Sequence, residues 1–505
     1  MSLAVVYARA KVGISAPLVH VEAHLSNGLP AFTIVGLPET AVKESKDRVR
    51  SAILNSNFEF PSRHITVNLA PADLPKEGGR FDLAIALGIL AASGQIPSQA
   101  LEKYEFLGEL ALTGALRKID GVIPAALLAS QFNRQLVLPE CNQQEVSLTC
   151  QDHLIANHLL QVCKHLCGEQ DLSTTPVLQQ HNEHYQGPDL AQVKGQPHAK
   201  RALEITAAGS HNLLMSGPPG TGKSLLAHCL PGILPPLDMN EALEVASLYS
   251  VSNQPQRPYF TTRPFRQPHH TSSGVALVGG GSHPKPGEIS LAHNGVLFLD
   301  EIPEFNRKVL DVMREPLETG QISISRAAQQ VDYPAKFQLV AAMNPCPCGY
   351  LKQANKRCSE CTESKALKYQ SSVSGPLLDR IDMQIEVPPL PRGLLSSNTT
   401  DSENSQLVKS RVEQARRKQI TRQGCSNAHL TQKQLAQFCP LDQPLSQLLE
   451  EALEKLGLSA RAYHRILKVA RTIADLANSD HIEKPHLLEA LGYRQLERRI
   501  GISSS

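Results

Sequence analysis

The segment NLLMSGPPGTGKSLLA restricts the fold more than any other part of the chain. Its first residues, Asn212 to Ser216, predict a short buried strand, and the apolar residues from Leu225 onward predict a helix. The glycines, lysine and serine between them have the spacing of a loop whose backbone N–H groups and following helix N-terminus face a bound anion. A strand, such a loop and a helix in this order are typical of a parallel α/β sheet covered by helices.

The loop predicts the binding of ATP together with Mg²⁺. We expect Lys223 to reach the β- and γ-phosphates and the Ser224 hydroxyl to ligate Mg²⁺. A purely structural glycine turn is the alternative, but the strand before the loop and the helix after it favour a phosphate site. The residues expected to surround the phosphates are Gly217, Pro218, Pro219, Gly220, Thr221, Gly222, Lys223 and Ser224.

A second run, GVLFLDE, completes the predicted site. Gly295 to Leu299 has the apolar composition of a buried strand, and Asp300 and Glu301 follow it directly. The carboxyl ends of parallel strands share the edge of the sheet where ligands bind. We therefore expect Asp300 to support Mg²⁺ and Glu301 to polarise the attacking water. Because acidic residues often end surface strands, it is the combination with the loop that predicts ATP hydrolysis.

The bulk composition excludes several classes of protein. With 505 residues the chain is long enough for about three domains, and its 41% hydrophobic residues can form sizeable cores. The net charge of +2 confines any nucleic-acid surface to a local patch. The most apolar run, LAIALGILAASG, is shorter than the roughly 20 residues of a membrane span. We therefore predict no membrane partner and a cytoplasmic, reducing location, in which disulfides are rare.

Four regions can be distinguished along the sequence. Residues 1–167 alternate short β-rich runs with helical periodicity, so we expect a mixed α+β domain. Residues 168–188 are polar and rich in turn formers, which predicts a linker. Strand and helix patterns alternate again over residues 189–392, the region that contains the phosphate loop. Residues 393–505 are almost wholly helical in pattern.

Four of the eleven cysteines gather in the segment NPCPCGYLKQANKRCSEC, an insertion at residues 344–361. The pairs Cys346-x-Cys348 and Cys358-x2-Cys361 have the spacing of a four-thiolate Zn²⁺ site. Four protein ligands leave no open position for water or substrate, so we expect structural Zn²⁺ and no catalysis at the metal. Free thiols without a metal are the alternative.

Longer segments identify a family. FQLVAAMNP, GPLLDRIDMQIEV, GLSARAYHRILKVARTIADL and RPFRQPHHTSSGVALVGGGSHPKPGEISLAHNGVLFLDE resemble the Mg-chelatase-like AAA+ ATPases called the YifB or ComM family, and the resemblance covers essentially the whole chain. It implies an AAA+ P-loop α/β core, a helical lid and a hexameric ring. It also implies that Asn344 senses the γ-phosphate, that Arg380 is an arginine finger reaching a neighbouring subunit's ATP, and that Arg461 is a second sensor in the lid.

The segment ISISRAAQQVDY predicts a hairpin just before the strand that ends at Asn344. Arg326 would lie near its tip, and in related helicases a hairpin at this position enters the pore of the ring and contacts DNA. A surface hairpin with one solvated arginine is the alternative. Arg314, which precedes the hairpin, is a candidate for the subunit interface. His269 and His270 are adjacent and cannot easily share one metal, so we expect them to position their loop.

Two N-terminal segments, LPKEGGRFDLAIALGILAASG and FLGELALTGALRKIDGVIPAALLA, resemble the Lon-type serine–lysine peptidase domain, whose fold is ribosomal S5 domain 2-like. In that family the first segment supplies a nucleophilic serine and the second a lysine that activates it. Here Arg80 occupies the serine position and Ile123 the lysine position. Since arginine has no hydroxyl and isoleucine cannot accept a proton, we expect no proteolysis. The domain would instead be a binding platform or stabilise the ring.

The resemblance implies a DNA motor. It would be a hexameric ATPase and helicase that promotes branch migration of recombination intermediates in natural transformation or homologous recombination. A chelatase-type motor and a protein-remodelling ATPase, each acting on a protein partner, stay open as alternatives. DNA, branched or single- or double-stranded, would be held mainly through its phosphates with weak sequence specificity. The basic run VKSRVEQARRKQITRQG is a candidate contact, although charge runs are usually solvated. Recombination proteins are further candidate partners.

Overall fold

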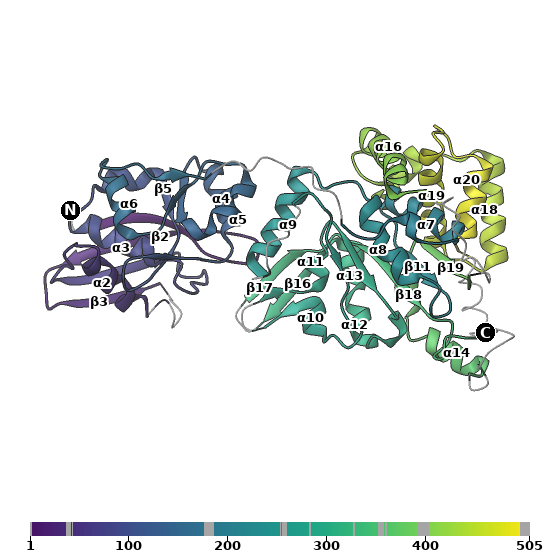
Figure 1. Ribbon diagram of the computed structural model, residues 1–505, viewed down its shortest axis with the longest axis horizontal. Helices are drawn as coiled ribbons and strands as arrows, with labels where there is room; N and C mark the ends of the chain where they lie inside the picture. Colours follow the sequence, from purple (N-terminus) through teal and green to yellow (C-terminus); the bar gives the residue numbers. More distant parts are fainter. Residues whose placement is uncertain are drawn as a thin grey trace.

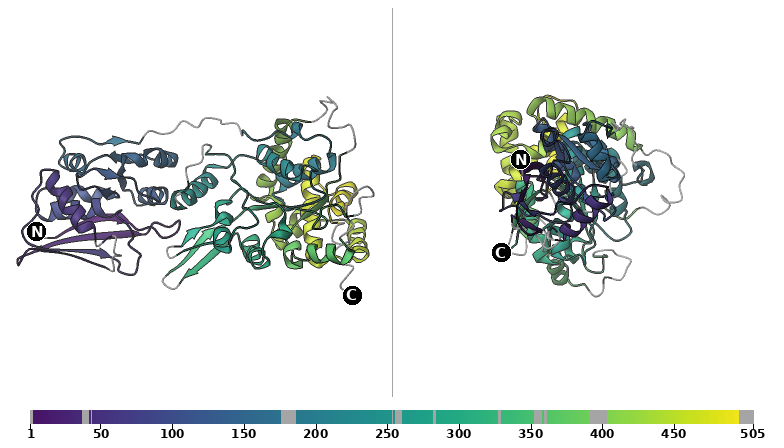
Figure 2. Two further views of the ribbon diagram at one scale, coloured as in Figure 1. Left: turned by 60° about the horizontal axis from the view of Figure 1, so that its bottom comes forward. Right: turned by 90° about the vertical axis from the view of Figure 1, so that its left-hand side faces the viewer.

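The computed structural model describes residues 3–36, 42, 44–175, 186–252, 254, 260–281, 284–326, 329–351, 358, 361–390 and 403–494. The N-terminal region forms one end of an elongated molecule, the parallel sheet lies in the middle, and the C-terminal helices form the other end (Figures 1 and 2). The mixed α/β content, the parallel sheet and the helical C-terminal part that the sequence predicts are thus confirmed.

The N-terminal sheet has the strand order β10-β9-β8-β5-β1-β2-β4-β3 in the described part of the chain. β1, β2 and β4 pair in antiparallel fashion, whereas β5, β8 and β9 run parallel to one another. The strands are β1 (Leu3–Arg9), β2 (Leu18–Ser26), β3 (Ala31–Val35), β4 (His64–Ala70), β5 (Tyr104–Phe106), β8 (Gln135–Pro139), β9 (Leu154–Ala156) and β10 (Ser173–Thr174). A separate small ribbon consists of β6 (Glu109–Leu110) and β7 (Leu116–Arg117).

Helices cover one side of this sheet. They are α2 (Ser45–Asn55), α3 (Asp82–Ala92), α4 (Val122–Gln131), α5 (Gln143–Val146) and α6 (Leu159–Leu166). Every residue of α3 is buried, because the helix packs on β1, β2 and α2 at once. The most apolar run of the sequence is therefore a core helix. Among the described helices, none has the length and apolar composition that a membrane crossing needs.

The N-terminal sheet continues beyond residue 167, where the sequence places the start of the linker. β10 pairs antiparallel with β9, through Ser173 with Ile155 and Thr174 with Leu154. An edge strand of two exposed polar residues is held by backbone hydrogen bonds and needs no apolar pattern, so composition alone suggests a linker. Of the expected linker, residues 176–185 lie outside the described residues.

Within the described residues, the central sheet has five parallel strands in the order β12-β15-β18-β11-β19. β15 and β18 are apolar runs that are buried along their whole length, as expected of parallel strands covered on both faces. The strands are β11 (Leu213–Ser216), β12 (Phe265–Arg266), β15 (Val296–Leu299), β18 (Gln338–Met343) and β19 (Met383–Glu386). The carboxyl ends of β11, β15 and β18 consequently meet at one edge.

Helices and two hairpins surround this sheet. The helices are α7 (Pro197–Gly209), α8 (Lys223–Ile233), α9 (Met239–Ser252), α10 (Gly274–Val278), α11 (Glu288–Leu291), α12 (Arg307–Val312), α13 (Arg314–Thr319), α14 (Glu363–Gln370) and α15 (Gly375–Leu378). β13 (Gly279–Gly280) pairs with β14 (Lys285–Pro286), and β16 (Gln321–Arg326) pairs with β17 (Gln329–Pro334). The second hairpin lies where the sequence predicts it.

The C-terminal helices form a lid that shares its core with the central sheet. The lid consists of α16 (Ser405–Gln423), α17 (Gln432–Phe438), α18 (Gln443–Leu456), α19 (Ala460–Leu476) and α20 (Lys484–Gly492). α19 buries an apolar face that includes Ile466, Ala470 and Ile473, and it packs on α7, α16 and α20. These residues belong to the same apolar cluster as Met215 of β11. The lid is therefore not an independently packed unit in this conformation.

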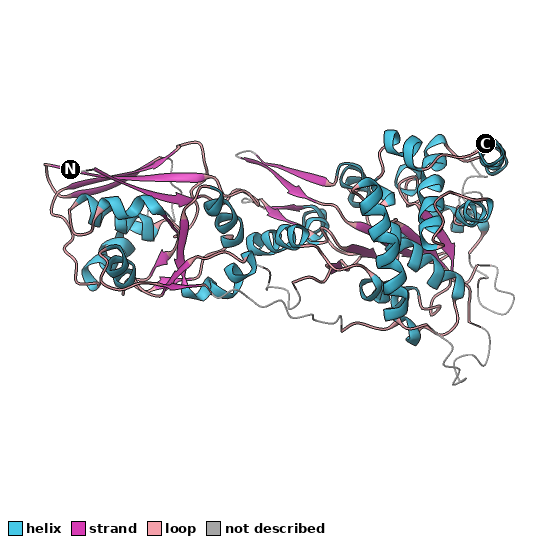
Figure 3. Cartoon of the chain, turned by 90° about the horizontal axis from the view of Figure 1, so that it is seen from above, coloured by secondary structure: helices cyan, strands magenta, loops and turns pink. Residues whose placement is uncertain are grey.

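Among the residues that the structure describes, the N-terminal region touches the central region at two places. Val12 and Ile14 pack against the apolar cluster that contains Val331 of the β16–β17 hairpin, and the hairpin extends toward the N-terminal region in Figure 2. At the second place, α4 lies against α9, which stands between the two regions in Figure 3. There the Gly121 N–H donates to the Ser250 carbonyl at 3.0 Å.

A substitution at Gly13 tests the first of these contacts, the one with the β16–β17 hairpin. It has φ +57°, and a Cβ built there would lie 2.4 Å from Cγ1 of Val331. We expect Gly13→Ala to push the hairpin away at a cost of about 1–3 kcal/mol and to speed amide hydrogen exchange across β17. Gly94→Ala is the matched control, since Gly94 has φ +79° with nothing within 4 Å of an added Cβ. Equal exchange in β17 for the two variants would contradict the described contact.

Candidate active site and metal centre

The phosphate loop connects the end of β11 to α8. The helix begins at Lys223, two residues before the start that the apolar pattern predicts. Gly217 lies so close to the end of β19 that a Cβ on it would sit 2.3 Å from the Val387 carbonyl oxygen. Gly222 has φ +89° and caps the helix, and nothing lies within 4 Å of its position for a Cβ. The loop therefore packs on the sheet on one side and leaves open space on the other, at a helix N-terminus suited to an anion.

Lys223 points into this loop. Its Nζ donates to the carbonyl oxygens of Gly217 at 2.7 Å and Pro218 at 2.9 Å, and to Oδ1 of Asn344 at 3.2 Å. Burial lowers the pKa of Lys223, while the negative charges of Asp300 and Glu301 oppose that shift. The structure thus brings together the loop lysine and Asn344, the polar residue that follows β18, because β11 and β18 are neighbours in the sheet.

Ser224 and Asp300 form the second pair of the site. The Ser224 hydroxyl donates to Oδ2 of Asp300 at 2.7 Å, and the two oxygens come from residues 76 positions apart in the chain. A hydroxyl and a carboxylate oxygen side by side are ligands that Mg²⁺ accepts. The donor set at this edge therefore fits a bound Mg²⁺ together with the phosphates of a nucleotide.

Glu301 has an uncommon backbone conformation. Its φ of +52° lies in the left-handed region, and its N–H donates to Oδ1 of Asp300 at 3.1 Å. For a residue with a side chain this conformation costs on the order of 1–3 kcal/mol and is concentrated at functional sites. Its side chain is exposed, and the residue comes directly after Asp300, which follows the end of β15.

The predicted arginines lie elsewhere. Arg380 is largely buried in an ion pair with Glu318 of α13, and its Nη1 donates to the Pro376 carbonyl at 2.7 Å. Arg461 is exposed at the second residue of α19. Among the described contacts, none joins either side chain to the phosphate loop of its own chain.

Arg465, one helical turn after Arg461, is a residue that the sequence analysis misses. Its Nη1 donates to Oδ1 of Asp382 at 2.5 Å and to the carbonyl oxygen of Arg380 at 3.1 Å. Burial opposes ionisation of Asp382, but Arg465 and the neighbouring donors hold its pKa well below its usual range. The lid helix that carries Arg461 is thus bound directly to the segment that carries Arg380. The i, i+4 spacing of two arginines at the start of an amphipathic helix could have indicated a shared role.

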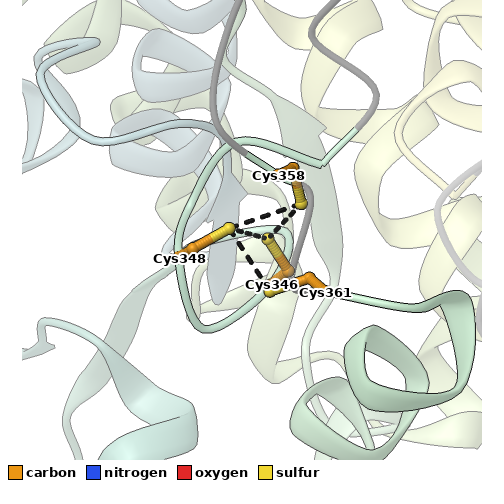
Figure 4. A group of neighbouring side chains, drawn as sticks. All are labelled: Cys346, Cys348, Cys358 and Cys361. Atoms are coloured by element: carbon orange, nitrogen blue, oxygen red, sulfur yellow. Dashed lines mark hydrogen bonds between the residues drawn. The ribbon is translucent and has the colours of Figure 1, made fainter.

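The four cysteines converge, as Figure 4 shows. The shortest Sγ–Sγ distances are 3.3 Å for Cys346–Cys348 and for Cys348–Cys361, 3.4 Å for Cys348–Cys358 and 3.9 Å for Cys346–Cys358. Four thiolates about 2.3 Å from a tetrahedral Zn²⁺ lie roughly 3.8 Å apart. The cluster therefore fits a structural Zn²⁺, and in the described part of the chain it is the one group of at least three potential ligands that converges in this way.

Three further candidates make contacts within the chain. Arg314 donates to the Ser374 hydroxyl at 2.8 Å and pairs with Asp311. The rings of His269 and His270 lie 4.2 Å apart, and His269 interacts with the Thr271 hydroxyl. The hairpin residue Arg326 ends β16, but its side chain lies outside the described residues, as do Lys352, Lys356 and Arg357 between the cysteine pairs.

Much of the basic run in α16 is engaged in contacts within the chain, some to α7 and others inside the lid. Arg411 pairs with Glu204 and Glu403, each at 2.6 Å, and Arg422 pairs with Asp475 at 2.7 Å. Arg416 donates to the Ala207 and Ala208 carbonyl oxygens. Charge density in the sequence therefore overstates the surface that this run offers to DNA. Arg417, whose side chain is 79% exposed, is better placed for such a contact.

The N-terminal domain has no catalytic pair at the positions predicted from the peptidase resemblance. Arg80 is buried, which lowers its pKa to about 10 against the opposing charges of Asp120 and Glu77. Ile123 is fully buried, and its N–H donates to the Ser250 hydroxyl of α9 at 3.5 Å. One position thus carries a buried cation, and the other belongs to the contact with the central region.

Comparisons with known proteins agree with this geometry. Residues 189–395 match the family described as magnesium chelatase, subunit ChlI, residues 21–142 match subunit ChlI of Mg-chelatase, and residues 402–494 match its C-terminal family. The chain is 53% identical over 504 residues to competence protein ComM of Haemophilus influenzae, covering 99% of this chain and 98% of that protein. It is 51% identical over 503 residues to uncharacterized protein YifB of Escherichia coli, with the same coverage. A magnesium-chelatase 38 kDa subunit of Rhodobacter capsulatus is 26% identical over 171 residues, which is 30% of this chain and 49% of that protein.

Glu301 and Glu304 offer a matched pair for testing the hydrolytic role. We expect Glu301→Gln to keep nucleotide binding but to lower the rate of ATP hydrolysis by about 100-fold or more, because the amide cannot accept a proton from water. Glu304→Gln, an exposed change in the same loop, should keep hydrolysis within a few-fold of the unmodified protein. Phosphate release and binding of a fluorescent ATP analogue measure the two effects. Similar hydrolysis by both variants would exclude Glu301 as the base.

Removal of two cysteines tests the metal centre. We expect Cys358→Ser with Cys361→Ser to release about one Zn²⁺ per chain, because two thiolates cannot complete the tetrahedron. Cys150→Ser with Cys167→Ser, two exposed cysteines outside the cluster, should keep the metal. Elemental analysis of the purified proteins measures the content, and equal metal content in the two double variants would contradict a Zn²⁺ site.

Proposed function

This chain belongs to the ComM/YifB family of Mg-chelatase-like AAA+ ATPases, and we propose that it is an ATP-driven, hexameric DNA motor that promotes branch migration of recombination intermediates. The observation that carries the ATPase part is the meeting of Lys223, Asn344, Ser224 and Asp300 at the carboxyl edge of the central sheet. The DNA part rests on the similarity to a competence protein over nearly the whole chain.

In the proposed hydrolysis, the site residues have separate roles. The loop from Gly217 to Ser224 wraps the phosphates with its N–H groups, and Lys223 exchanges its contacts with loop carbonyls for contacts with the β- and γ-phosphates. Ser224 and Asp300 would hold Mg²⁺, which would neutralise charge on the phosphates. Glu301 accepts a proton from the attacking water, and Asn344 orients the γ-phosphate from the end of β18.

Arg380 acts on the ATP of a neighbouring subunit. Its ion pair with Glu318 must open for this, since the Arg380 side chain is only 12% exposed in the single chain. An arginine supplied from another subunit stabilises charge on the transferring phosphoryl group, so full activity requires the ring. Arg461, at the start of α19, contacts the nucleotide from the lid of its own subunit. The bonds of Arg465 to Asp382 and to the Arg380 carbonyl would then link lid position to finger position.

In this proposal the DNA lies in the pore of the ring and is held there. The β16–β17 hairpin is the proposed contact, and the N-terminal domain supports it through Val12 and Ile14. Binding through phosphates predicts weak sequence specificity and strong weakening by salt. We place this activity in the cytoplasm, in natural transformation or homologous recombination, with recombination proteins as partners.

A chelatase-type or protein-remodelling motor is the second candidate. It is favoured by the similarity to the magnesium-chelatase 38 kDa subunit, but that similarity covers only 30% of this chain. Such a motor would hydrolyse ATP at the same residues without acting on DNA. A measurement on DNA therefore separates the two functions.

A four-way DNA junction with fluorescent arms tests the proposed function. We expect the protein with ATP at low salt to move the branch point, and Lys223→Ala and Glu301→Gln to abolish the movement because neither variant hydrolyses ATP. Glu304→Gln should still move the junction. ATP hydrolysis by the unmodified protein without DNA binding or junction movement would overturn the DNA motor and favour the second candidate.

A further inference from the structure

The turn that carries the first cysteine pair lies directly on the phosphate loop. It begins two residues after Asn344, and within it the Gly349 N–H donates to the Cys346 carbonyl at 2.9 Å. Gly349 is buried with φ +84°, and a Cβ on it would lie 2.5 Å from Cδ and 3.0 Å from Cγ of Pro219. Both the backbone conformation and the close approach to Pro219 therefore require a glycine at this position.

The helix after the second cysteine pair reaches the other half of the nucleotide site. In α14, Nε2 of Gln370 donates to the Pro345 carbonyl at 2.7 Å, back at the base of the cysteine turn. Just beyond α14, the Ser372 hydroxyl donates to the Pro303 carbonyl at 3.0 Å, in the loop that follows Glu301.

The cysteines connect these two contacts. Cys346 and Cys348 belong to the turn against Pro219, while Cys361 lies two residues before the start of α14. Sulfur atoms at 3.3–3.9 Å from one another attract weakly as thiols, since S–H is a poor hydrogen-bond donor. A metal ion bound to four thiolates would hold the turn and the helix in one fixed arrangement.

We infer that the four-cysteine centre is a working part of the nucleotide site: with Zn²⁺ bound, it presses Gly349 against Pro219 and holds the loop after Glu301 through α14, and so sets the affinity for ATP. This rests on the proposed ATPase function and assigns regulation of that site by metal occupancy. Gly349 is a positioning residue, because it acts on the phosphates through Pro219. Loss of the metal frees the turn, and the phosphate loop loses its support on that side.

The first variant disturbs the contact between Gly349 and Pro219 without removing a metal ligand. Gly349→Ala keeps all four cysteines, so we expect normal Zn²⁺ content together with an affinity for a fluorescent ATP analogue that is weaker by about tenfold. Gly457→Ala is the matched control, because Gly457 has φ +64° with nothing within 4 Å of an added Cβ and lies in the lid. It should bind the nucleotide like the unmodified protein.

A second variant tests the same contact by removing the metal. Cys358→Ser with Cys361→Ser should lose Zn²⁺, show a similar loss of affinity, and exchange amide hydrogens faster between Gly217 and Lys223. Two outcomes would each overturn the inference: Gly349→Ala binding as tightly as Gly457→Ala, or the cysteine variant losing Zn²⁺ with unchanged nucleotide affinity and exchange. The unmodified protein is measured first, since its failure to bind the analogue would instead overturn the proposed ATPase function and this inference with it.

Discussion

The hydrogen bond between Ser224 and Asp300 depends on the order of strands in the central sheet. β11 and β15 are separated by β18, and all three run parallel, so their carboxyl ends present the phosphate loop, Asn344 and the acidic pair at one edge. A different strand order would leave the same motifs intact in the sequence and separate them in space. The chemistry proposed for this protein therefore depends on the order of strands in the sheet as well as on the individual side chains.

The lid and the cysteine turn are joined to the central sheet and its loops by both polar and apolar contacts. The lid helix α19 binds Asp382 and the Arg380 carbonyl through Arg465, and the lid shares an apolar core with β11. The cysteine turn contacts the phosphate loop, and the segment just beyond α14 contacts the loop after Glu301. The lid is thus attached to the segment that carries Arg380, and the cysteine turn to the phosphate loop.

Sequence analysis predicted the elements whose chemistry is local. The phosphate loop, the strand before Asp300, the hairpin before the sensor strand and the cysteine pairs each occupy a short segment, and each is formed in the structure. It did not predict β10, because backbone pairing at a sheet edge leaves no apolar pattern. It overestimated the basic run, because the partners of Arg411 and Arg422 are acidic residues distant in the sequence.

The sequence by itself determined the residue types: a loop that fits phosphates, carboxylates for Mg²⁺ and water, four cysteines, and an arginine and an isoleucine at the positions that the peptidase resemblance assigns to serine and lysine. Spacing suffices for these because neighbouring residues cannot lie far apart. The tertiary structure decided which groups meet. Gly349 rests on Pro219, Arg465 binds the segment of Arg380, and Arg380 pairs with Glu318. Such contacts join residues far apart in the chain, and only the packing of the folded protein brings them together.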